Sequence, residues 1–494
     1  MIVVSIGRGR HKMMIAEHKH LAEEGADLVE LRVDFIVRAV NLKRLLADRP
    51  GPTIVTCRRE QDGGKWNTSE EERIMLLRSA IAEGVDYVDL EEDIAGQIPR
   101  FGKTKRIISY HNFHETPKEL REIHDRLKEF DPDMIKMATM AHNPRDNIRM
   151  LELIAESDVP TVAFCMGDMG TASRILGARF GAPLTYATLH QDRALAPGQL
   201  SFKQMRDVYH YNDITPNTEV YAVIADPIGH SMSPAVHNAA FQALSMEKVY
   251  VPIRVPTEEL ENFMSYCRGF GLKGLSVTIP HKEAILDYID STEAAVDHIG
   301  AANTVVLDTF GKLAYNTDFK AALASIDNTL GRGGDVDVLA GRGAIVLGAG
   351  GVAKAVVHAL KTRNVDVTIA SRTLERAEQL ANQFSCKAIN WKSRHKDSYD
   401  MLINCTPIGM HPHVDESPFE GSALRRSMIV FDMVYNPEQT LLIKQARDIQ
   451  ASVITGVDMF VRQAALQFKL FTEQDPPPDT MREAIKQAIG AVKS

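Results

Sequence analysis

Residues 343–360 read GAIVLGAGGVAKAVVHAL, an apolar run that leads through a glycine-rich turn into a helical pattern. Gly348, Gly350 and Gly351 allow the tight bend that such a turn needs and let a phosphate approach the backbone. Because an expected strand precedes these glycines and a helix follows them, the stretch predicts a Rossmann-type α/β domain that binds a dinucleotide.

The next expected strand ends in ASRTLER, at 370–376. An NAD-binding domain would place Asp or Glu here to bind the ribose hydroxyls. Arg372, Thr373 and Arg376 stand at this point instead, and arginine forms strong paired hydrogen bonds with phosphate. The stretch therefore favours NADPH, whose ribose carries a 2′-phosphate.

The composition of the whole chain limits the kind of protein. Its 494 residues are enough for about three domains. A content of 44% hydrophobic and 25% charged residues is typical of a globular protein, and a net charge of -8 argues against a nucleic-acid partner. We expect small-molecule substrates, and the sequence indicates no oligomeric state.

Features of targeting and redox chemistry point to the cytoplasm. No apolar run approaches the ~18 residues of a membrane span, and an expected strand begins directly after Met1. The five cysteines are scattered and contain no CxxC motif. We therefore expect reduced thiols, no membrane partner and a cytoplasmic location.

Eight apolar, β-rich runs alternate with helical patterns in residues 1–212. The runs are IVVSI, LVELRVD, TIVTC, YVDLEE, RIISY, MIKMAT, TVAFC and LTYATL. Eight β/α units are typical of a (β/α)8 TIM barrel, in which reactive side chains follow the carboxyl ends of the strands. The polar side chains that we expect near this rim are Glu30, Arg32, Arg58, His111, Lys136, Arg174 and Gln199.

Lys136 lies among Met and Ile in the sequence DMIKMATM. Desolvation there would favour the neutral amine, which attacks carbonyl groups. A lysine at this position can also extend to the barrel rim or pair with a carboxylate. The strand alone does not distinguish these roles.

His111 and His114 stand in IISYHNFHETP, at 107–117. Residues three apart on an extended chain point to opposite faces, so the two imidazoles do not easily bind one metal ion. We expect no metal site. His111 is either a general acid and base or one of two polar residues that close a strand.

The stretch YHYNDITPNTEV breaks the barrel pattern and predicts a linker at 213–219. A second α/β domain is expected at 220–325, and the dinucleotide-binding domain at 326–464. Helices at about 465–494 are expected to complete the second domain.

Several polar residues of the second domain have two interpretations. Ser233 before Pro234 is typical of a helix N-cap, yet a helix N-terminus with hydroxyl groups also binds carboxylates. Lys282 follows a predicted strand and Asp318 begins a predicted helix. A solvated charge and a helix cap would explain this pair as well as catalysis would.

Six stretches of the barrel, taken in order, resemble type I 3-dehydroquinate dehydratase. They are ELRVD at 30–34, TCRREQDGG at 56–64, SYHNFHETP at 109–117, IKMAT at 135–139, SRILGARFG at 173–181 and APGQ at 196–199. The resemblance implies that Lys136 forms a Schiff base with the ketone of 3-dehydroquinate. His111 would then move the adjacent proton and protonate the leaving hydroxyl.

The same resemblance implies which residues hold the carboxylate and hydroxyls of this substrate. They are Glu30, Arg32, Arg58, Asp62, Arg174 and Gln199. Asp62 stands where the family commonly has Glu, and Leu195 stands where Ser is common. These two departures concern substrate affinity rather than the lysine and histidine chemistry.

Residues 220–494 resemble shikimate dehydrogenase. The stretches concerned are ADPIGHSMSPAVHNAAF at 225–241, LSVTIPHKEA at 275–284, AYNTDFKAA at 314–322, VLGAGGVAKA at 346–355, ASRTLER at 370–376, INCTPIGM at 403–410, FDMVYNP at 431–437 and TGVDMFVRQAALQF at 455–468. The order of the two halves is similar to that of bifunctional dehydroquinate dehydratase-shikimate dehydrogenases. The product of the first half, 3-dehydroshikimate, would be reduced to shikimate by the second.

The second resemblance also implies site residues. Lys282 and Asp318 would form the catalytic pair. Substrate-binding residues would be Ser231, Ser233, Thr278, Asn303, Tyr435 and Gln463. NADPH-binding residues would be Gly348, Ala349, Gly350, Gly351, Val352, Ala353, Ser371, Arg372, Thr373, Arg376, Thr406 and Gly456. Ser276 and Ser371 are departures, because the family often has Asn at these positions.

Two alternative functions remain at this stage. One is an NAD-using quinate/shikimate dehydrogenase fused to a dehydratase, against which Arg372 argues. The other is a non-catalytic regulator that senses pathway metabolites. Such a regulator would be expected to have lost Lys136, His111, Lys282 or Asp318, and all four residues are present.

Overall fold

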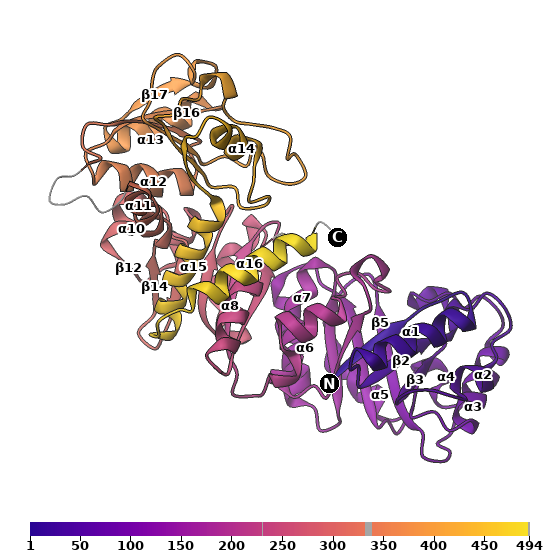
Figure 1. The fold of residues 1–494 in the computed structure, drawn as a ribbon. Coiled ribbons are helices and arrows are strands. Elements are labelled where there is room, and N and C mark those ends of the chain that lie inside the picture. Colours follow the sequence, from indigo (N-terminus) through magenta and orange to yellow (C-terminus); the bar gives the residue numbers. More distant parts are fainter. Residues whose placement is uncertain (230, 331–337, 493–494) are drawn as a thin grey trace. The chain divides into compact units, whose positions relative to one another are not determined.

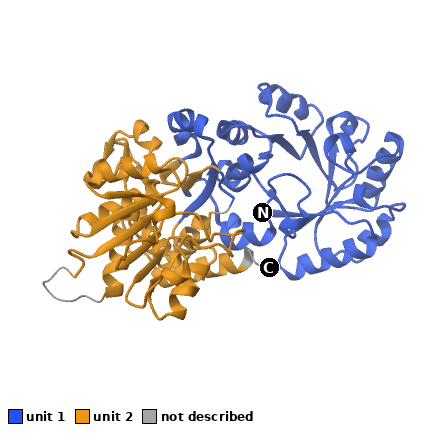
Figure 2. Ribbon diagram, turned by 90° about the horizontal axis from the view of Figure 1, so that it is seen from above, with its two compact units in different colours: residues 1–220, 227–229, 247–271 blue, residues 221–226, 230–246, 272–494 orange. Residues whose placement is uncertain are grey.

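A computed structural model describes residues 1–229, 231–330 and 338–492. The chain divides into two compact units (Figure 2). Unit 1 consists of residues 1–220, 227–229 and 247–271, and unit 2 of residues 221–226, 230–246 and 272–494. No helix of the described residues is long and apolar enough to cross a membrane. All five cysteines are free.

The first sheet, in unit 1, consists of eight parallel strands. Its order, β7-β6-β5-β4-β3-β2-β1-β8, is barrel-like and confirms the predicted (β/α)8 class. The strands are β1 (Ile2–Ile6), β2 (Leu28–Arg32), β3 (Thr53–Thr56), β4 (Tyr87–Glu91), β5 (Lys105–Asn112), β6 (Met134–Met140), β7 (Thr161–Met166) and β8 (Thr185–Thr188). Most of their residues are buried, as expected for strands covered on both faces.

Helices connect these strands. They are α1 (His11–Glu23), α2 (Leu42–Leu46), α3 (Glu70–Ala82), α4 (Glu92–Ala95), α5 (Leu120–Lys128), α6 (Pro144–Glu156) and α7 (Thr171–Leu176). The side chain of Asn143 caps α6 by accepting from the Asp146 N–H, and Pro144 supplies the favourable first turn. After β8 a single π-helical turn, Gln204–Val208, follows in place of the long helix that the eighth β/α unit predicts.

The second sheet has the order β10-β9-β11-β13-β14-β12. Its strands are β9 (Glu219–Ala225), β10 (Lys248–Arg254), β11 (Leu272–Val277), β12 (Ser291–Thr292), β13 (Thr304–Leu307) and β14 (Lys312–Tyr315). The associated helices are α8 (Ser233–Ala243), α9 (Leu260–Tyr266) and α10 (Ala294–Ile299). β13 runs antiparallel to both of its neighbours, β11 and β14, whereas β14 runs parallel to β12.

The third sheet is wholly parallel and has the order β17-β16-β15-β18-β19-β20. Its strands are β15 (Gly343–Leu347), β16 (Asp366–Ser371), β17 (Lys387–Asn390), β18 (Met401–Asn404), β19 (Ile429–Asp432) and β20 (Ser452–Ile454). From β15 the sheet extends to both sides: β16 and β17 lie on one side, and β18, β19 and β20 lie on the other. This is the dinucleotide-binding order, in which the ligand lies outside the carboxyl ends of these strands.

Helices of unit 2 cover this sheet and the previous one. They are α11 (Thr317–Leu330), α12 (Gly351–Lys361), α13 (Leu374–Phe384), α14 (Leu441–Asp448), α15 (Gly456–Thr472) and α16 (Pro478–Val492). α16 packs against α8 and α15 (Figure 1). The predicted domain boundaries remain a proposal, and residues 493–494 of the closing segment lie outside the described residues.

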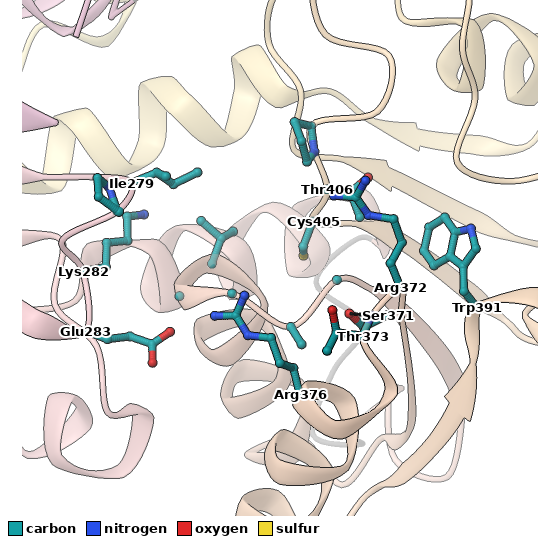
Figure 3. A pocket seen from close by; sticks show the side chains of 17 residues that line it. Ile279, Lys282, Glu283, Ser371, Arg372, Thr373, Arg376, Trp391, Cys405 and Thr406 are labelled. Atoms are coloured by element: carbon teal, nitrogen blue, oxygen red, sulfur yellow. Dashed lines mark hydrogen bonds between the residues drawn. The ribbon is translucent and has the colours of Figure 1, made fainter. Parts of the chain in front are cut away.

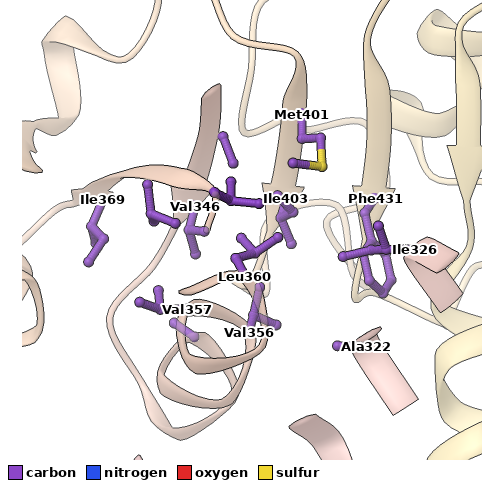
Figure 4. Close-up of a cluster of buried hydrophobic side chains, with 14 of the residues drawn as sticks. Ala322, Ile326, Val346, Val356, Val357, Leu360, Ile369, Met401, Ile403 and Phe431 are labelled. Carbon is purple, nitrogen blue, oxygen red and sulfur yellow. The ribbon is translucent and has the colours of Figure 1, made fainter. Parts of the chain in front are cut away.

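A buried apolar cluster fixes α12 against the third sheet (Figure 4). Val356 and Leu360 of α12 pack with Val346 of β15 and Ile403 of β18, and all four are at most 1% exposed. Burial of each such side chain stabilises the fold by about 1.5–3 kcal/mol. The glycine turn between β15 and α12 is therefore held between two rigid elements.

The predicted N-cap role of Ser233 is wrong. Met232 occupies the N-cap of α8, and Ser233 is the first residue of the helix. The Ser231 hydroxyl accepts a hydrogen bond from the Ser233 N–H at 3.3 Å. Ser231, two residues earlier, therefore supplies the side-chain oxygen that we expected from Ser233.

Candidate active sites

A cavity of about 50 Å³ opens beside the carboxyl ends of the barrel strands. Its lining includes every residue predicted for the dehydratase site: Glu30, Arg32, Arg58, Asp62, His111, Lys136, Arg174 and Gln199. They come from six strands and the loops that follow them, so the parallel arrangement alone brings them to one place. Leu195 also lines this cavity.

Lys136 projects from β6 toward two carboxylates. Its Nζ lies 3.1 Å from Asp89 Oδ2 and 3.7 Å from Glu30 Oε1, and 4.0 Å from the centre of the Tyr186 ring. Of the two arrangements that the sequence left open, the structure confirms the pairing with carboxylates, and the apolar surroundings are wrong. Successive side chains of a strand alternate between its faces, so the neighbouring Ile135 and Met137 do not surround the amine.

Asp89 joins the lysine to the next cation of the site. Its buried carboxylate accepts from Arg58 Nη2 at 2.9 Å and from Ser109 Oγ at 2.6 Å, in addition to Lys136. Burial opposes its ionisation, but Arg58 and Lys136 outweigh burial and hold the pKa of the Asp89 carboxyl well below its ordinary value. Asp89 is therefore a fixed negative charge between the Arg58 and Lys136 side chains.

Sequence reasoning missed Asp89 and Glu91, although both lie in the expected strand YVDLEE. Glu91 accepts from Arg58 Nη1 and from Arg73 Nη1, each at 2.8 Å. The signal was available: residues two apart in a strand share a face, and this was a barrel strand whose polar residues were not considered.

His111 extends from β5, and its Nδ1 lies 2.9 Å from Arg58 Nη1. A guanidinium only donates, so Nδ1 accepts and the neutral ring carries its proton on Nε2. Burial and the cations Arg58 and Lys136 lower the pKa of His111 well below its ordinary value. His111 is therefore neutral at physiological pH, as a general base must be.

We predict that this shift is measurable. His111 should bind its proton at a pH well below 6.5, and Arg58→Leu should raise the pKa because it removes a nearby cation. NMR titration of the His111 ring, with His111→Gln to assign the signal, measures this change. A His111 that titrates near 6.5 in the unaltered chain contradicts the prediction.

His114 is exposed in the turn after β5. Its backbone N–H donates to Asn112 Oδ1 at 2.8 Å, and its carbonyl oxygen contacts His142 Nε2. Among the described residues no group of three or more His, Cys, Asp or Glu side chains could hold a metal ion. The contact that orients the His111 ring comes from Arg58 rather than from His114.

Arg174 offers a buried positive charge that forms no ion pair with a carboxylate among the described residues. It is 1% exposed, and its guanidinium lies 4.3 Å from the centre of the Phe164 ring. Burial lowers the pKa of Arg174 to about 10, so the group is still charged at neutral pH. Its Nε has no hydrogen-bond partner among the described residues. An anionic substrate group would satisfy this cation.

The other predicted barrel residues are held by the protein. Arg32 donates to both carboxylate oxygens of Asp34, at 2.9 and 2.8 Å. Asp62 accepts from Arg59 Nε at 2.7 Å, so it lines the cavity while paired with a neighbour. Gln199 accepts from the Leu195 N–H at 3.0 Å. Leu195 stands where the family commonly has Ser, but this contact uses its backbone N–H and does not depend on the side chain.

Unit 2 contains a second, larger cavity of about 370 Å³ (Figure 3). Lys282 lines it, and the Lys282 Nζ lies 2.5 Å from Asp318 Oδ2. Asn316, rather than Asp318, accepts from the Phe319 N–H at the start of α11. Helix capping therefore does not account for Asp318, and the ion pair places its carboxylate beside the buried lysine.

The floor of this cavity is the glycine turn. Gly348 has φ +112°, and a Cβ there would lie 3.0 Å from the Cys405 carbonyl oxygen. A Cβ on Gly351 would lie 3.1 Å from Lys282 Cβ. Gly350 is the N-cap of α12 and has no side chain, so the first N–H groups of the helix remain available to an anion.

Ten of the twelve predicted cofactor residues line this cavity. They are Gly348, Ala349, Gly350, Gly351, Val352, Ser371, Arg372, Thr373, Arg376 and Thr406. Ala353 is fully buried in the apolar cluster beneath α12, and Gly456 begins α15, where a Cβ would lie 2.2 Å from the Val434 carbonyl oxygen. Both therefore act in packing rather than in the cavity wall.

Comparison with known proteins decides the family. The model of type I 3-dehydroquinase matches residues 2–216. Models of the shikimate dehydrogenase substrate binding domain, of shikimate / quinate 5-dehydrogenase and of the shikimate 5′-dehydrogenase C-terminal domain match residues 223–305, 334–452 and 456–486. The bifunctional 3-dehydroquinate dehydratase/shikimate dehydrogenase of Arabidopsis thaliana, called chloroplastic, is 37% identical over 94% of this chain and 81% of its own length.

The chain belongs to the bifunctional 3-dehydroquinate dehydratase/shikimate dehydrogenases. The shikimate dehydrogenase (NADP(+)) of Methanothermobacter thermautotrophicus is 37% identical over 56% of this chain and 99% of its own length. A crystal structure of a shikimate dehydrogenase in complex with NADP+ covers 56% of this chain and 97% of its own, with 34% identity and a TM-score of 0.52.

The residues of the second cavity fit NADP(H), the cofactor of this enzyme. The uncapped start of α12 suits a pyrophosphate, and Arg372, Thr373 and Arg376 suit a 2′-phosphate. Ser371 stands where the family often has Asn. Its hydroxyl still stabilises the turn after β16, because it accepts a hydrogen bond from the Thr373 N–H at 3.4 Å. Ser276, the other departure, donates to Gln467 Oε1 at 2.9 Å inside the dehydrogenase half.

The six predicted substrate-binding residues of the dehydrogenase lie outside the lining of this cavity: Ser231, Ser233, Thr278, Asn303, Tyr435 and Gln463. Asn303 is buried; its side chain donates to Thr317 Oγ1 at 2.9 Å and accepts from the Thr317 N–H at 2.8 Å. It thereby fixes the residue before Asp318. The Tyr435 ring packs 4.9 Å from that of Phe460. Substrate binding by these residues stays a prediction.

We predict that Arg372→Ala selectively weakens NADPH binding. Loss of a charge-assisted phosphate contact costs about 1.5–3 kcal/mol, or roughly 10- to 150-fold in affinity, while NADH has no such phosphate. Calorimetry with both cofactors measures the difference. Arg426→Ala, at an exposed arginine outside the cavity, is the control. Equal losses with NADPH and NADH would contradict the assignment.

Proposed function

We propose that the two cavities catalyse consecutive steps of the shikimate pathway through the residues described above. The barrel site converts 3-dehydroquinate to 3-dehydroshikimate, and the site in unit 2 reduces 3-dehydroshikimate to shikimate with NADPH. The observation that carries the proposal is the pairing of an amine with a proton-transfer partner in each cavity. Lys136 and His111 line the first, and Lys282 contacts Asp318 beside the second.

In the barrel, Lys136 first gives up a proton to water, and its neutral amine then attacks the substrate ketone and forms a protonated imine with loss of water. The imine withdraws electrons from the adjacent carbon, so a proton there becomes acidic enough for a neutral imidazole. Asp89 and Glu30 stabilise the positive charge on the lysine nitrogen. Arg174 binds the substrate carboxylate, because it is a buried cation with an unsatisfied donor.

Arg58 controls when His111 can accept that proton. In the structure Nδ1 of His111 is occupied by the Arg58 donor. When Arg58 turns its donor to a substrate oxygen, Nδ1 is free to take the proton. The resulting imidazolium then protonates the leaving hydroxyl, and hydrolysis of the imine releases the product and restores Lys136.

In the dehydrogenase half, Lys282 donates a proton to the carbonyl oxygen of the substrate. NADPH, when bound, supplies the hydride that converts this carbonyl into the alcohol. Asp318 holds the lysine side chain in place through their 2.5 Å contact. The packing of Gly351 against Lys282 sets the lysine beside the glycine turn.

A coupled assay tests both halves together. Purified protein mixed with 3-dehydroquinate and NADPH should consume NADPH steadily, because the first site supplies the substrate of the second. NADPH consumption with added 3-dehydroshikimate but none with 3-dehydroquinate would refute the barrel assignment. Formation of 3-dehydroshikimate without any NADPH consumption would refute the dehydrogenase assignment of the site in unit 2.

We also propose that the partners of the chain are the small molecules 3-dehydroquinate, 3-dehydroshikimate and shikimate, and that the enzyme works in the cytoplasm. The name of the Arabidopsis relative places that protein in the chloroplast. Fractionation of the source cells with an antibody to the chain tests the location. Recovery with an organelle instead of the soluble fraction would refute it.

A further inference from the structure

Trp391 belongs to the cofactor cavity but was not predicted from the sequence. It directly follows β17, the edge strand beside β16. Ser371 and Asn390, the last residues of β16 and β17, are paired in the sheet. The next residues, Arg372 and Trp391, therefore follow the carboxyl ends of neighbouring strands. Figure 3 shows both side chains toward one end of the cavity and Lys282 toward the other.

The indole of Trp391 is held from one side. The Arg394 guanidinium lies 4.3 Å from the centre of the indole ring. Arg394 is itself fixed, because its Nε donates to the Pro418 carbonyl oxygen at 2.7 Å and its Nη1 to the Trp391 carbonyl oxygen at 2.8 Å. The Asn390 side chain accepts from the Lys392 N–H at 2.9 Å and stabilises the turn. Trp391 is thus a supported aromatic surface that lines the cavity.

The chemistry of the cofactor relates this surface to Arg372. The 2′-phosphate and the adenine ring are attached to adjacent carbons of one ribose. A phosphate bound at Arg372 therefore places adenine within one ribose of that residue. The glycine turn follows β15 on one side of β16, and Trp391 follows β17 on the other. The pyrophosphate suits the first side, which leaves the second side for adenine.

We propose that Trp391 binds the adenine ring of NADP(H) by stacking and so contributes to cofactor affinity. The inference rests on the proposed NADPH-dependent reduction. An indole face offers a large apolar surface to any purine, and the Arg394 cation behind it keeps the ring oriented. Arg372 then selects the 2′-phosphate, while Trp391 recognises the base.

Fluorescence tests the proposal with Trp391 itself unaltered. The chain has two tryptophans, so Trp66→Phe leaves Trp391 as the sole one. Adenosine 2′,5′-bisphosphate, which contains adenine and the 2′-phosphate but no nicotinamide, should quench this emission as NADP+ does. Nicotinamide mononucleotide should leave it unchanged. NADP+ binding seen by calorimetry without quenching overturns the stacking proposal, whereas failure of NADP+ to bind at all overturns the cofactor assignment.

Variants test the contribution to affinity. Trp391→Leu keeps an apolar side chain but removes the aromatic face, and should weaken adenosine 2′,5′-bisphosphate binding by roughly 5- to 150-fold. Trp391→Phe should retain most of the affinity, and Trp66→Leu should retain all of it. A thermal unfolding transition at the temperature of the unaltered chain shows that each variant keeps its fold. Equal affinity of Trp391→Leu and the unaltered chain would overturn the proposal.

Discussion

Lys136→Ala should abolish the covalent intermediate and reduce dehydratase turnover by roughly 10⁴- to 10⁶-fold, the scale expected when a covalent nucleophile is removed. In the unaltered enzyme, borohydride added with 3-dehydroquinate should reduce the imine and leave a stable adduct on Lys136. Peptide mass spectrometry locates this adduct. The alanine variant should carry no adduct, since none of the other described residues that line this cavity is a lysine.

Two further variants make this result specific. His111→Ala should slow proton transfer but still permit trapping at Lys136, because imine formation precedes proton removal. Lys105→Ala, at an exposed lysine near the start of β5, should behave like the unaltered enzyme. All variants should still reduce added 3-dehydroshikimate with NADPH. An adduct on another lysine, or loss of dehydratase activity to a chelator, would overturn the assignment.

Lys282→Ala should lower the turnover of the dehydrogenase by about 10² to 10⁴-fold, the range for loss of a general acid. NADP+ affinity should persist, because the glycine turn and Arg372 supply the main cofactor contacts. Calorimetry and steady-state kinetics separate these two effects. Asp318→Asn should also lower turnover, since it removes the charge that holds Lys282 at 2.5 Å.

Lys320 provides the matched control for this second experiment. It is an exposed lysine on α11, the helix that carries Asp318, and it pairs with Glu293. Lys320→Ala should leave reduction of 3-dehydroshikimate unchanged. If NADP+ affinity collapsed in Lys282→Ala, Lys282 would have to be reassigned to cofactor binding or to structure.

Asp89 shows why part of the barrel site was missed. The strand sequence YVDLEE indicates which of its residues share a face, but not that Asp89 faces Lys136, which lies 47 residues further along the chain. Their contact depends on the register of β4, β5 and β6 and on the inward face of each strand. The sequence of one strand does not show which residues of other strands lie opposite it, because a shift of the pairing by one residue would turn every side chain to the other face.

Asp62 and Ala353 illustrate the same limit at the level of single side chains. The resemblance places Asp62 near the substrate, and the structure adds that Arg59 holds its carboxylate at 2.7 Å. Ala353 follows the glycine turn in sequence, yet the rotation of α12 directs it into the apolar core. Sequence position gives proximity along the chain, whereas the helix face determines which side chain meets the ligand.

The sequence by itself determined the order of the β/α units, the glycine turn and the residues that can attack a carbonyl or bind phosphate. These follow from local periodicity and from the chemistry of single side chains. Only the tertiary structure decided that Asp89 contacts both Lys136 and Arg58. It also decided that Asp318 contacts Lys282, 36 residues away in the chain, and that Trp391 extends beside Arg372. The reason is physical: such pairs form only when strands from distant segments align, and packing of the whole core fixes that alignment.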